Sequence, residues 1–215
     1  MTHDAFNQIV KFGVVPVIAI EHVDHAIPLA DALLEAGLGI AEITFRTEAA
    51  ADVLAKIRDE RPDLLIGAGT ILNTDQLQRA IDAGAAFGLA PGCDLNLVKA
   101  ATSAGLPFAP GVMTPTDISL AVAHGCRLMK FFPAMPAGGP SMLSNISAPF
   151  KHLGLKFVPT GGVKIGNMQD WLSKPEIAAV GGTWIATTEM MHAGKWAEIT
   201  ANARAAAQRA QEIRQ

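Results

Sequence analysis

Short apolar runs that end in small or turn-forming residues recur along the whole chain. Runs of this length, bounded by such residues, are typical of buried strands. Successive runs end 20 to 29 residues apart, which leaves room for one strand, one helix and two loops. The predicted strands are Val14–Ala19, Ile40–Thr44, Leu64–Ala68, Ala86–Leu89, Pro107–Pro110, Arg127–Lys130, Lys156–Pro159 and Ile177–Gly182.

Between these runs, apolar residues recur at helical spacing. Asparagine, aspartate or proline opens several of the stretches, and glycine closes most of them, as is common at helix ends. The alanine-rich final stretch has one candidate break, at Gly194. The predicted helices are Asp4–Phe12, His25–Ala36, Asp75–Ala83, Leu95–Ala104, Ile118–His124, Met168–Ser173 and Glu189–Arg214.

The alternation of strands and helices predicts a parallel sheet. Eight such units in 215 residues favour an α/β protein with a compact (β/α)8 TIM barrel, formed by residues 1–215 as a single domain. Asp4–Phe12 is then an extra N-terminal helix ahead of the first strand. An open doubly wound sheet is the alternative, but Gly13-Val14-Val15-Pro16 stands where its glycine-rich turn would be expected.

Composition narrows the class of protein further. Half of the residues are hydrophobic and 17% are charged, which is enough apolar surface for a substantial core. The net charge is −3 and no basic block appears, so neither a nucleic acid nor an anionic membrane is expected as a partner. The longest strongly apolar run, Val14 to Ile20, is far below the ~18 residues of a membrane-spanning helix, and the chain start lacks a signal-peptide plan. We therefore expect a cytoplasmic protein.

The spacing of cysteine and histidine residues indicates neither a disulfide framework nor a metal site. Cys93 and Cys126 are interpreted as small buried hydrophobic residues in a reducing compartment. His22 and His25 form the only close pair of histidines, and they fall where a helix begins, which favours a surface or capping role. Because no His-x-x-x-His or carboxylate cluster appears, the sequence predicts no metal and no cofactor.

Two ionisable residues stand where hydrophobic residues would cost less free energy. Lys130 lies in the apolar run Cys126–Pro133, and Glu42 lies in the apolar run Gly39–Arg46. Burial disfavours the ammonium form of a lysine, and a neutral amine is what a Schiff-base lysine needs. The alternative is a structural salt bridge, which is a poor scaffold because its attraction barely offsets the desolvation cost.

The alternation of side chains along a strand shows which residues can share a face. Glu42 shares its face with Thr44 and Arg46, and Lys130, Thr70 and Thr160 each lie near the end of another strand. If these faces point inward, the side chains meet in one pocket at the carboxyl ends of the strands, where barrels carry their reactive groups. Arg46 is then a clamp for a carboxylate or phosphate, and its alternative is an exposed cation at the strand end. Lys156 shares the face of Thr160 and is the rival to Lys130 as the reactive amine.

Two glycine pairs stand at the ends of the last two predicted strands. They stand in Pro159–Val163 and in Val180–Thr183. Glycine lets backbone N–H groups approach an anion, and the loops after the seventh and eighth strands of barrels often bind phosphate. The sequence therefore predicts a phosphate site there.

Six short motifs follow one another along the chain. They are Glu42–Thr47, Gly67–Thr70, Ala90–Gly92, Lys130–Ala134, Pro159–Gly162 and Gly181–Trp184. In this order they resemble the motifs of the 2-keto-3-deoxy-6-phosphogluconate aldolase family, which also includes 4-hydroxy-2-oxoglutarate aldolases, and the resemblance covers roughly residues 5–205. The chain departs from the usual family pattern at Ala90 and Thr183, where the family often has serine.

The resemblance implies a role for each matching residue. It makes Lys130 the Schiff-base lysine and Glu42 the general acid and base. It also implies a homotrimer. The implied binding positions are Arg46 and Thr70 for the pyruvate carboxylate, Pro91 and Phe132 around the pyruvyl group, Thr160 near the substrate hydroxyls, and Gly161, Gly162, Gly182 and Thr183 at the phosphate.

The expected function is that of a lyase, a metal-independent class I aldolase of the Entner–Doudoroff pathway. It would cleave 2-keto-3-deoxy-6-phosphogluconate, a small phosphorylated keto acid, into pyruvate and glyceraldehyde 3-phosphate. Within the same class, 4-hydroxy-2-oxoglutarate or the 6-phosphogalactonate epimer is the alternative substrate. A non-covalent phosphosugar epimerase or decarboxylase is a second alternative. A non-catalytic phosphosugar-binding barrel is the alternative from a different class.

Overall fold

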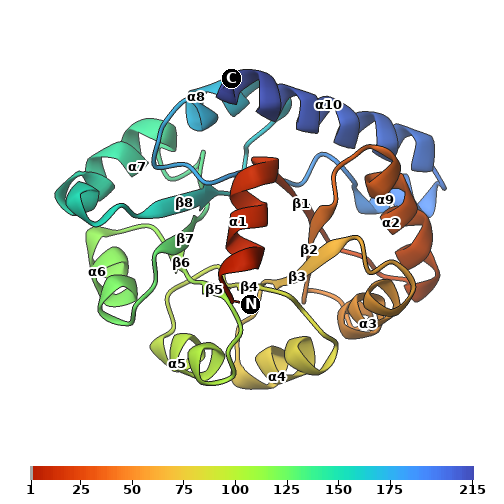
Figure 1. The fold of residues 1–215 in the computed structure, drawn as a ribbon, viewed down its shortest axis with the longest axis horizontal. Helices are drawn as coiled ribbons and strands as arrows, with labels where there is room; N and C mark the ends of the chain where they lie inside the picture. Colours follow the sequence, from red (N-terminus) through yellow and green to blue (C-terminus); the bar gives the residue numbers. More distant parts are fainter. Residues whose placement is uncertain (1) are drawn as a thin grey trace.

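The computed structural model describes residues 2–215, with side chains from Ala5 onward. Its strands form a ring surrounded by helices, as Figure 1 shows. This confirms the predicted α/β barrel. The strands are β1 (Val14–Ile18), β2 (Ile40–Thr44), β3 (Leu65–Gly69), β4 (Gly88–Leu89), β5 (Phe108–Ala109), β6 (Gly111–Val112), β7 (Leu128–Phe131), β8 (Lys156–Pro159) and β9 (Val180–Gly182).

All strand pairs in the described part of the chain are parallel, and together they close the ring. One sheet has the order β5-β4-β3-β2-β1-β9 and the other the order β6-β7-β8. Bridges from Phe157 to Ile177 and from Thr160 to Gly181 join β8 to β9. Pro110, which has no N–H group to donate, separates β5 from β6, so these two segments occupy a single strand position of the barrel.

Helices on the outside of the ring connect the strands. None of the helices described between residues 2 and 215 has both the length and the apolar character needed to cross a membrane. The helices are α1 (Thr2–Phe12), η1 (Val23–His25), α2 (Ala26–Glu35), α3 (Ala50–Glu60), α4 (Thr74–Asp82), α5 (Leu95–Ser103), α6 (Pro115–Ala123), α7 (Gly139–Ser147), η2 (Ala148–Leu153), η3 (Ile165–Asn167), α8 (Met168–Leu172), α9 (Thr188–His192) and α10 (Trp196–Arg214).

Two helices, α3 and α7, were not predicted. Ala49 precedes α3 and Gly138 precedes α7, and neither offers a side chain that caps the helix. A capping side chain is therefore missing at both places, and the proline at the start of α7, Pro140, was the one remaining start signal there. The predicted helix Glu189–Arg214 is divided into α9 and α10 near Gly194, whose φ of 64° lies in the left-handed region that glycine adopts most readily.

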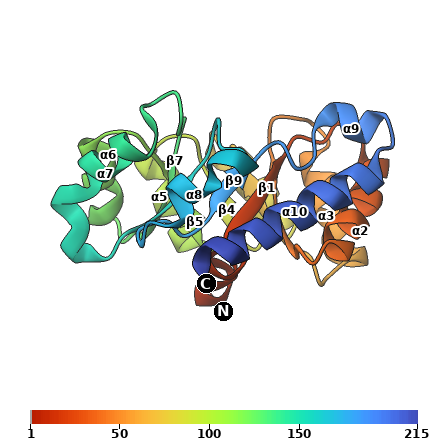
Figure 2. The same cartoon turned by 90° about the horizontal axis from the view of Figure 1, so that it is seen from above.

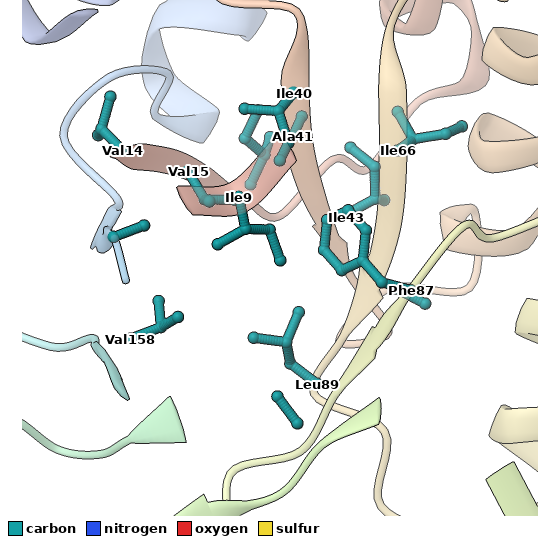
Figure 3. Packing of buried hydrophobic residues seen from close by; sticks show 14 of the residues in the cluster. Ile9, Val14, Val15, Ile40, Ala41, Ile43, Ile66, Phe87, Leu89 and Val158 are labelled. Carbon is teal, nitrogen blue, oxygen red and sulfur yellow. The ribbon is translucent and has the colours of Figure 1, made fainter. Parts of the chain in front are cut away.

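The barrel interior is packed with aliphatic and aromatic side chains, some of which Figure 3 shows. They come from the strands and from α1, the extra N-terminal helix, which lies across the centre of the ring in the view of Figure 1. Because α1 leads directly into β1, it covers the amino ends of the strands. The opposite, carboxyl end of the barrel remains for the functional groups.

Arg214 ties the last helix to the first elements of the chain at this amino end. Its guanidinium donates hydrogen bonds to the backbone oxygens of Val10, Ile177 (3.3 Å) and Ala178 (2.5 Å). Helix α10 accordingly packs against α1, and Figure 2 shows the last turn of α10 over α1. One side chain thus satisfies carbonyls of α1 and of the segment leading into β9.

We expect Arg214→Gln to lower the free energy of unfolding by about 1–3 kcal/mol, because partly buried carbonyls lose a charged donor. Urea denaturation of the two proteins measures the difference. Arg209→Gln on the same helix is the matched control, since Arg209 makes only exposed side-chain contacts, with Glu212 at 3.1 Å and with Gln169 at 2.7 Å, and such contacts contribute little. Equal losses in the two variants would contradict this role of Arg214.

Candidate active site

Glu42 of β2 and Lys130 of β7 meet inside the barrel. Lys130 Nζ donates a hydrogen bond of 2.8 Å to Glu42 Oε1. Both residues are buried, with 1% of Glu42 and 4% of Lys130 exposed. Following the order of strands around the ring, β2 and β7 stand on opposite sides. Side chains from opposite walls touch only if both point inward, so the contact identifies the inner face of both strands.

Gly69 makes the room for the Glu42 carboxylate. A Cβ atom built at Gly69 would overlap Glu42 Oε1, and a Cβ at Gly181 would likewise overlap Thr160 Oγ1. At Gly111 it would overlap the backbone of Pro91. These three glycines serve close approach, a role that the sequence analysis did not assign to any of them.

Lys156, the rival amine, lies elsewhere. It begins β8, at the amino end of that strand, and is exposed. Its Nζ donates a hydrogen bond of 2.5 Å to the backbone oxygen of Pro175. Lys156 and Thr160 do share one strand face, as predicted, but they stand at opposite ends of the strand. This separates Lys156 from the carboxyl-end site.

Thr70 follows β3 and has a strained backbone. Among the described residues, Thr70 is the one residue other than glycine that has a positive φ, at 56°. A threonine there costs free energy, and such strain often accompanies functional sites. The hydroxyl of Thr160, at the end of β8, is buried, with 3% of the residue exposed. Its Oγ1 makes only a long 3.5 Å contact with the Val158 oxygen.

A cavity of about 260 Å³ lies next to the ends of β1 and β2. Arg46 and Thr183, both predicted as binding residues, line it together. Arg46 is exposed at the strand end and has no ion pair among the residues from Ala5 onward, so its guanidinium is available to an anion. The remaining lining residues are Val17, Ala19, Thr44, Ala186, Thr187, Thr188 and Glu189.

Thr44 and Thr188 belong to this cavity but were not predicted as site residues. Thr44 Oγ1 donates to the Ile18 oxygen at 3.1 Å, and Thr188 Oγ1 donates to the Ala19 oxygen at 3.2 Å. Both hydroxyls therefore hold the end of β1 in place. The shared face of Glu42 and Thr44 was a usable signal for Thr44, whereas Thr188 directly precedes the predicted helix Glu189–Arg214 and carried no such signal.

Phe132 and Pro91 are partly exposed residues at strand ends. Phe132 is 37% exposed, and the Lys130 ammonium lies 6.0 Å from the centre of its ring. This distance is within the range of a cation–π contact. The backbone of Pro91 packs against Gly111, which is the partner of Lys130 in the β6–β7 register.

The predicted phosphate glycines lie in two different settings. Gly161 and Gly162 follow β8 with φ of 100° and 76°, and the Met135 N–H donates to the Gly161 oxygen at 2.9 Å. Gly182 is buried inside β9, where a Cβ would press on the Trp184 ring. The cavity with Arg46 and Thr183 is not lined by Gly161 or Gly162.

The cysteines offer no nucleophile to this site. Both are free and only partly buried, rather than buried as expected. Burial raises the pKa of the Cys126 thiol to about 11, so it stays protonated at neutral pH.

We expect Gly69→Ala to displace the Glu42 carboxylate and lengthen its contact with Lys130. Overpacking of this kind costs about 1–3 kcal/mol of stability, which urea denaturation measures, and a crystal structure of the variant would show the displacement. Gly166→Ala is the control, because a Cβ there meets nothing within 4 Å. An unchanged contact and unchanged stability in Gly69→Ala would refute the close-approach argument.

The geometry can be compared with known proteins. The model of the family described as KDPG and KHG aldolase matches residues 6–202. The chain is 39% identical to the 2-dehydro-3-deoxy-phosphogluconate aldolase of Haemophilus influenzae, over 92% of each chain. It is 39% identical to the KHG/KDPG aldolase of Escherichia coli K12, over 90% of each chain.

A solved structure is similar as well. It is the KDPG aldolase of Legionella pneumophila, with pyruvate captured as a covalent carbinolamine intermediate. The TM-score is 0.89 at 36% identity, and the match covers 94% of this chain and 97% of that one.

Proposed function

The chain belongs to the KDPG and KHG aldolase family, and on that premise we propose that it cleaves 2-keto-3-deoxy-6-phosphogluconate into pyruvate and glyceraldehyde 3-phosphate through a Schiff base on Lys130. The observation that carries the proposal is the buried 2.8 Å contact between Lys130 and Glu42. An amine and a carboxylate in direct contact, shielded from water, can exchange a proton without solvent.

The proposed reaction begins at the C2 ketone of the substrate. Lys130, once it has passed a proton to Glu42, attacks C2 and forms a carbinolamine. Glu42 returns the proton to the C2 hydroxyl, which leaves as water, and a protonated imine remains. Direct transfer is possible because the two groups already share a hydrogen bond.

Carbon–carbon cleavage follows from this imine. Glu42, now a carboxylate, accepts the proton of the C4 hydroxyl, and the electrons of the C3–C4 bond move into the iminium. Glyceraldehyde 3-phosphate leaves and an enamine remains on Lys130. Protonation of the enamine at C3 and addition of water at C2 then release pyruvate and free the lysine.

The ends of the substrate need their own contacts. We assign the pyruvate carboxylate to Arg46 and Thr70, and the wall around the pyruvyl group to Pro91 and Phe132. The free guanidinium of Arg46 at the end of β2 supports the first assignment, and the 6.0 Å approach of Lys130 to the Phe132 ring supports the second. Thr160 is assigned to the substrate hydroxyls, because its buried side chain lies at a strand end.

The phosphate is assigned to the loops after β8 and β9, with Gly161, Gly162, Gly182 and Thr183. The positive φ angles of Gly161 and Gly162 turn the backbone in a way that suits anion binding. Thr183 is exposed and lines the cavity that contains Arg46, which supports a substrate spanning from carboxylate to phosphate. The working form we propose is a cytoplasmic homotrimer.

A second substrate is favoured by one comparison. The Escherichia coli relative is named a KHG/KDPG aldolase, and we propose that this chain also cleaves 4-hydroxy-2-oxoglutarate to glyoxylate and pyruvate. That reaction uses the same lysine and glutamate but needs no phosphate contact. We expect 2-keto-3-deoxy-6-phosphogluconate to be preferred over 4-hydroxy-2-oxoglutarate.

Incubation with pyruvate and borohydride is expected to fix one pyruvyl group on Lys130, because reduction of the imine makes the bond permanent. Peptide mass mapping locates the modified lysine. Lys130→Met is expected to lose both the adduct and the cleavage activity, whereas Glu42→Gln slows turnover about 10²–10⁴-fold and leaves substrate binding nearly intact.

Lys156→Met serves as the control for the borohydride experiment, since Lys156 lies at the amino end of β8. It should keep normal trapping and normal rates. Near-normal cleavage by Lys130→Met, or an adduct on Lys156, would sink the Schiff-base assignment. Saturable binding of the phosphosugar without any turnover would instead favour a non-catalytic barrel.

Thr183→Val is expected to raise the KM for 2-keto-3-deoxy-6-phosphogluconate about tenfold or more, because a hydrogen bond to a charged phosphate is lost. The KM for 4-hydroxy-2-oxoglutarate should stay unchanged, since that substrate has no phosphate. Thr183→Ser keeps the hydroxyl and is the matched control. Equal effects of Thr183→Val on both substrates would place the side chain elsewhere in the site.

A further inference from the structure

A second group of chemically active side chains lies at the surface near the start of α2. Glu21 and His22 follow β1, and His192 ends α9. All three residues are exposed, and one ligand atom from each lies within 4.8 Å of the others. Glu21 Oε2 and His192 Nε2 are 3.2 Å apart. Figure 1 shows α9 beside α2, which brings these distant parts of the chain together.

These three side chains are a suitable ligand set for a transition metal. Imidazole nitrogen and carboxylate oxygen bind Zn²⁺ at about 2.0–2.2 Å, usually with tetrahedral geometry. Ligand atoms at those bond lengths stand about 3.3 Å apart, which the 3.2 Å separation of Glu21 and His192 nearly matches. Because His22 is exposed, its ring can turn to complete the set.

Two further aromatic rings lie beside the histidines. His25 packs edge-on against His22, with the ring centres 5.3 Å apart, and its ring centre lies 5.9 Å from that of His192. Trp196 of α10 packs against His25, with the ring centres 5.5 Å apart.

A surface ion pair between Glu21 and His192 is the simpler interpretation of the same contact. Such a pair would contribute little to stability, and it does not involve His22. The ring centres of His22 and His192, however, are 5.3 Å apart. The cluster thus places two imidazoles and a carboxylate from two separate segments around one point.

We propose that Glu21, His22 and His192 bind a divalent transition-metal ion, with Zn²⁺ as the best match to the ligand types. Three protein ligands leave a fourth position open for water. None of the three residues lines the cavity with Arg46 and Thr183. The site is also separate from Lys130 and Glu42, which are buried inside the barrel, whereas the three proposed ligands are exposed.

The bound ion cross-links the segment after β1 to α9. Two hydrogen bonds already fix this segment: Thr47 Oγ1 donates to the Ile20 oxygen at 2.6 Å, and Thr188 Oγ1 donates to the Ala19 oxygen at 3.2 Å. Ala19 and Thr188 both line the cavity. The metal thus braces one wall of the substrate cavity from outside, and its main effect is on stability.

The test uses the full chain after treatment with a chelator. Calorimetric titration with Zn²⁺ measures binding, and scanning calorimetry measures Tm at each Zn²⁺ concentration. We expect one saturable Zn²⁺ per chain and a Tm that rises with Zn²⁺ concentration. His192→Ala and His22→Ala should weaken binding at least about tenfold and abolish the Tm rise. Glu21→Gln keeps the side-chain shape, so it tests the ligand charge without a packing change.

His152→Ala is the matched control, because His152 is an exposed histidine elsewhere on the surface. It should bind Zn²⁺ as the unmodified chain does. Equal Tm values of all metal-free proteins would show that the substitutions leave the fold intact. Cu²⁺ should also quench the fluorescence of Trp196, and Trp196→Phe should remove that part of the quenching.

The proposal is overturned if no 1:1 Zn²⁺ binding is found, or if the affinity is the same in the His22, His192 and Glu21 variants. A Tm rise that persists in His192→Ala would likewise place the ion elsewhere.

Discussion

The contact between Lys130 and Glu42 is the constraint on which the site depends. Removing a charged amine and a carboxylate from water is costly, and their attraction offsets that cost only when the geometry is close. The barrel supplies this geometry by placing the two residues on opposite walls, 2.8 Å apart at their tips. A buried pair of this kind is a weak contributor to stability. The same closeness permits direct proton transfer between the two groups, which is the role we propose for them.

The surrounding structure serves that contact. Gly69 leaves space where any side chain would strike the Glu42 carboxylate, and Gly111 and Gly181 leave similar space for Pro91 and Thr160. The parallel register then brings every strand end to the same side of the barrel. Helix α1 covers the other side, so substrate meets the pair from the carboxyl end.

The proposed catalytic pair and the proposed metal site lie in different parts of the structure. Lys130 and Glu42, the proposed reacting pair, are buried inside the barrel, whereas Glu21, His22 and His192 are exposed to water. Between them stands the cavity wall, held by threonine hydroxyls that donate to the backbone after β1.

The sequence by itself determined the alternation of strands and helices and the two misplaced charges, because periodicity and the cost of burying an ion are local properties of the chain. It missed α3 and α7, whose N-caps are Ala49 and Gly138 and carry no capping side chain. Only the tertiary structure decided that Glu42 touches Lys130, that Lys156 lies at the far end of β8, and that His192 approaches His22. Such distances follow from closure of the barrel, in which residues far apart in sequence become neighbours through the packing of all the strands at once.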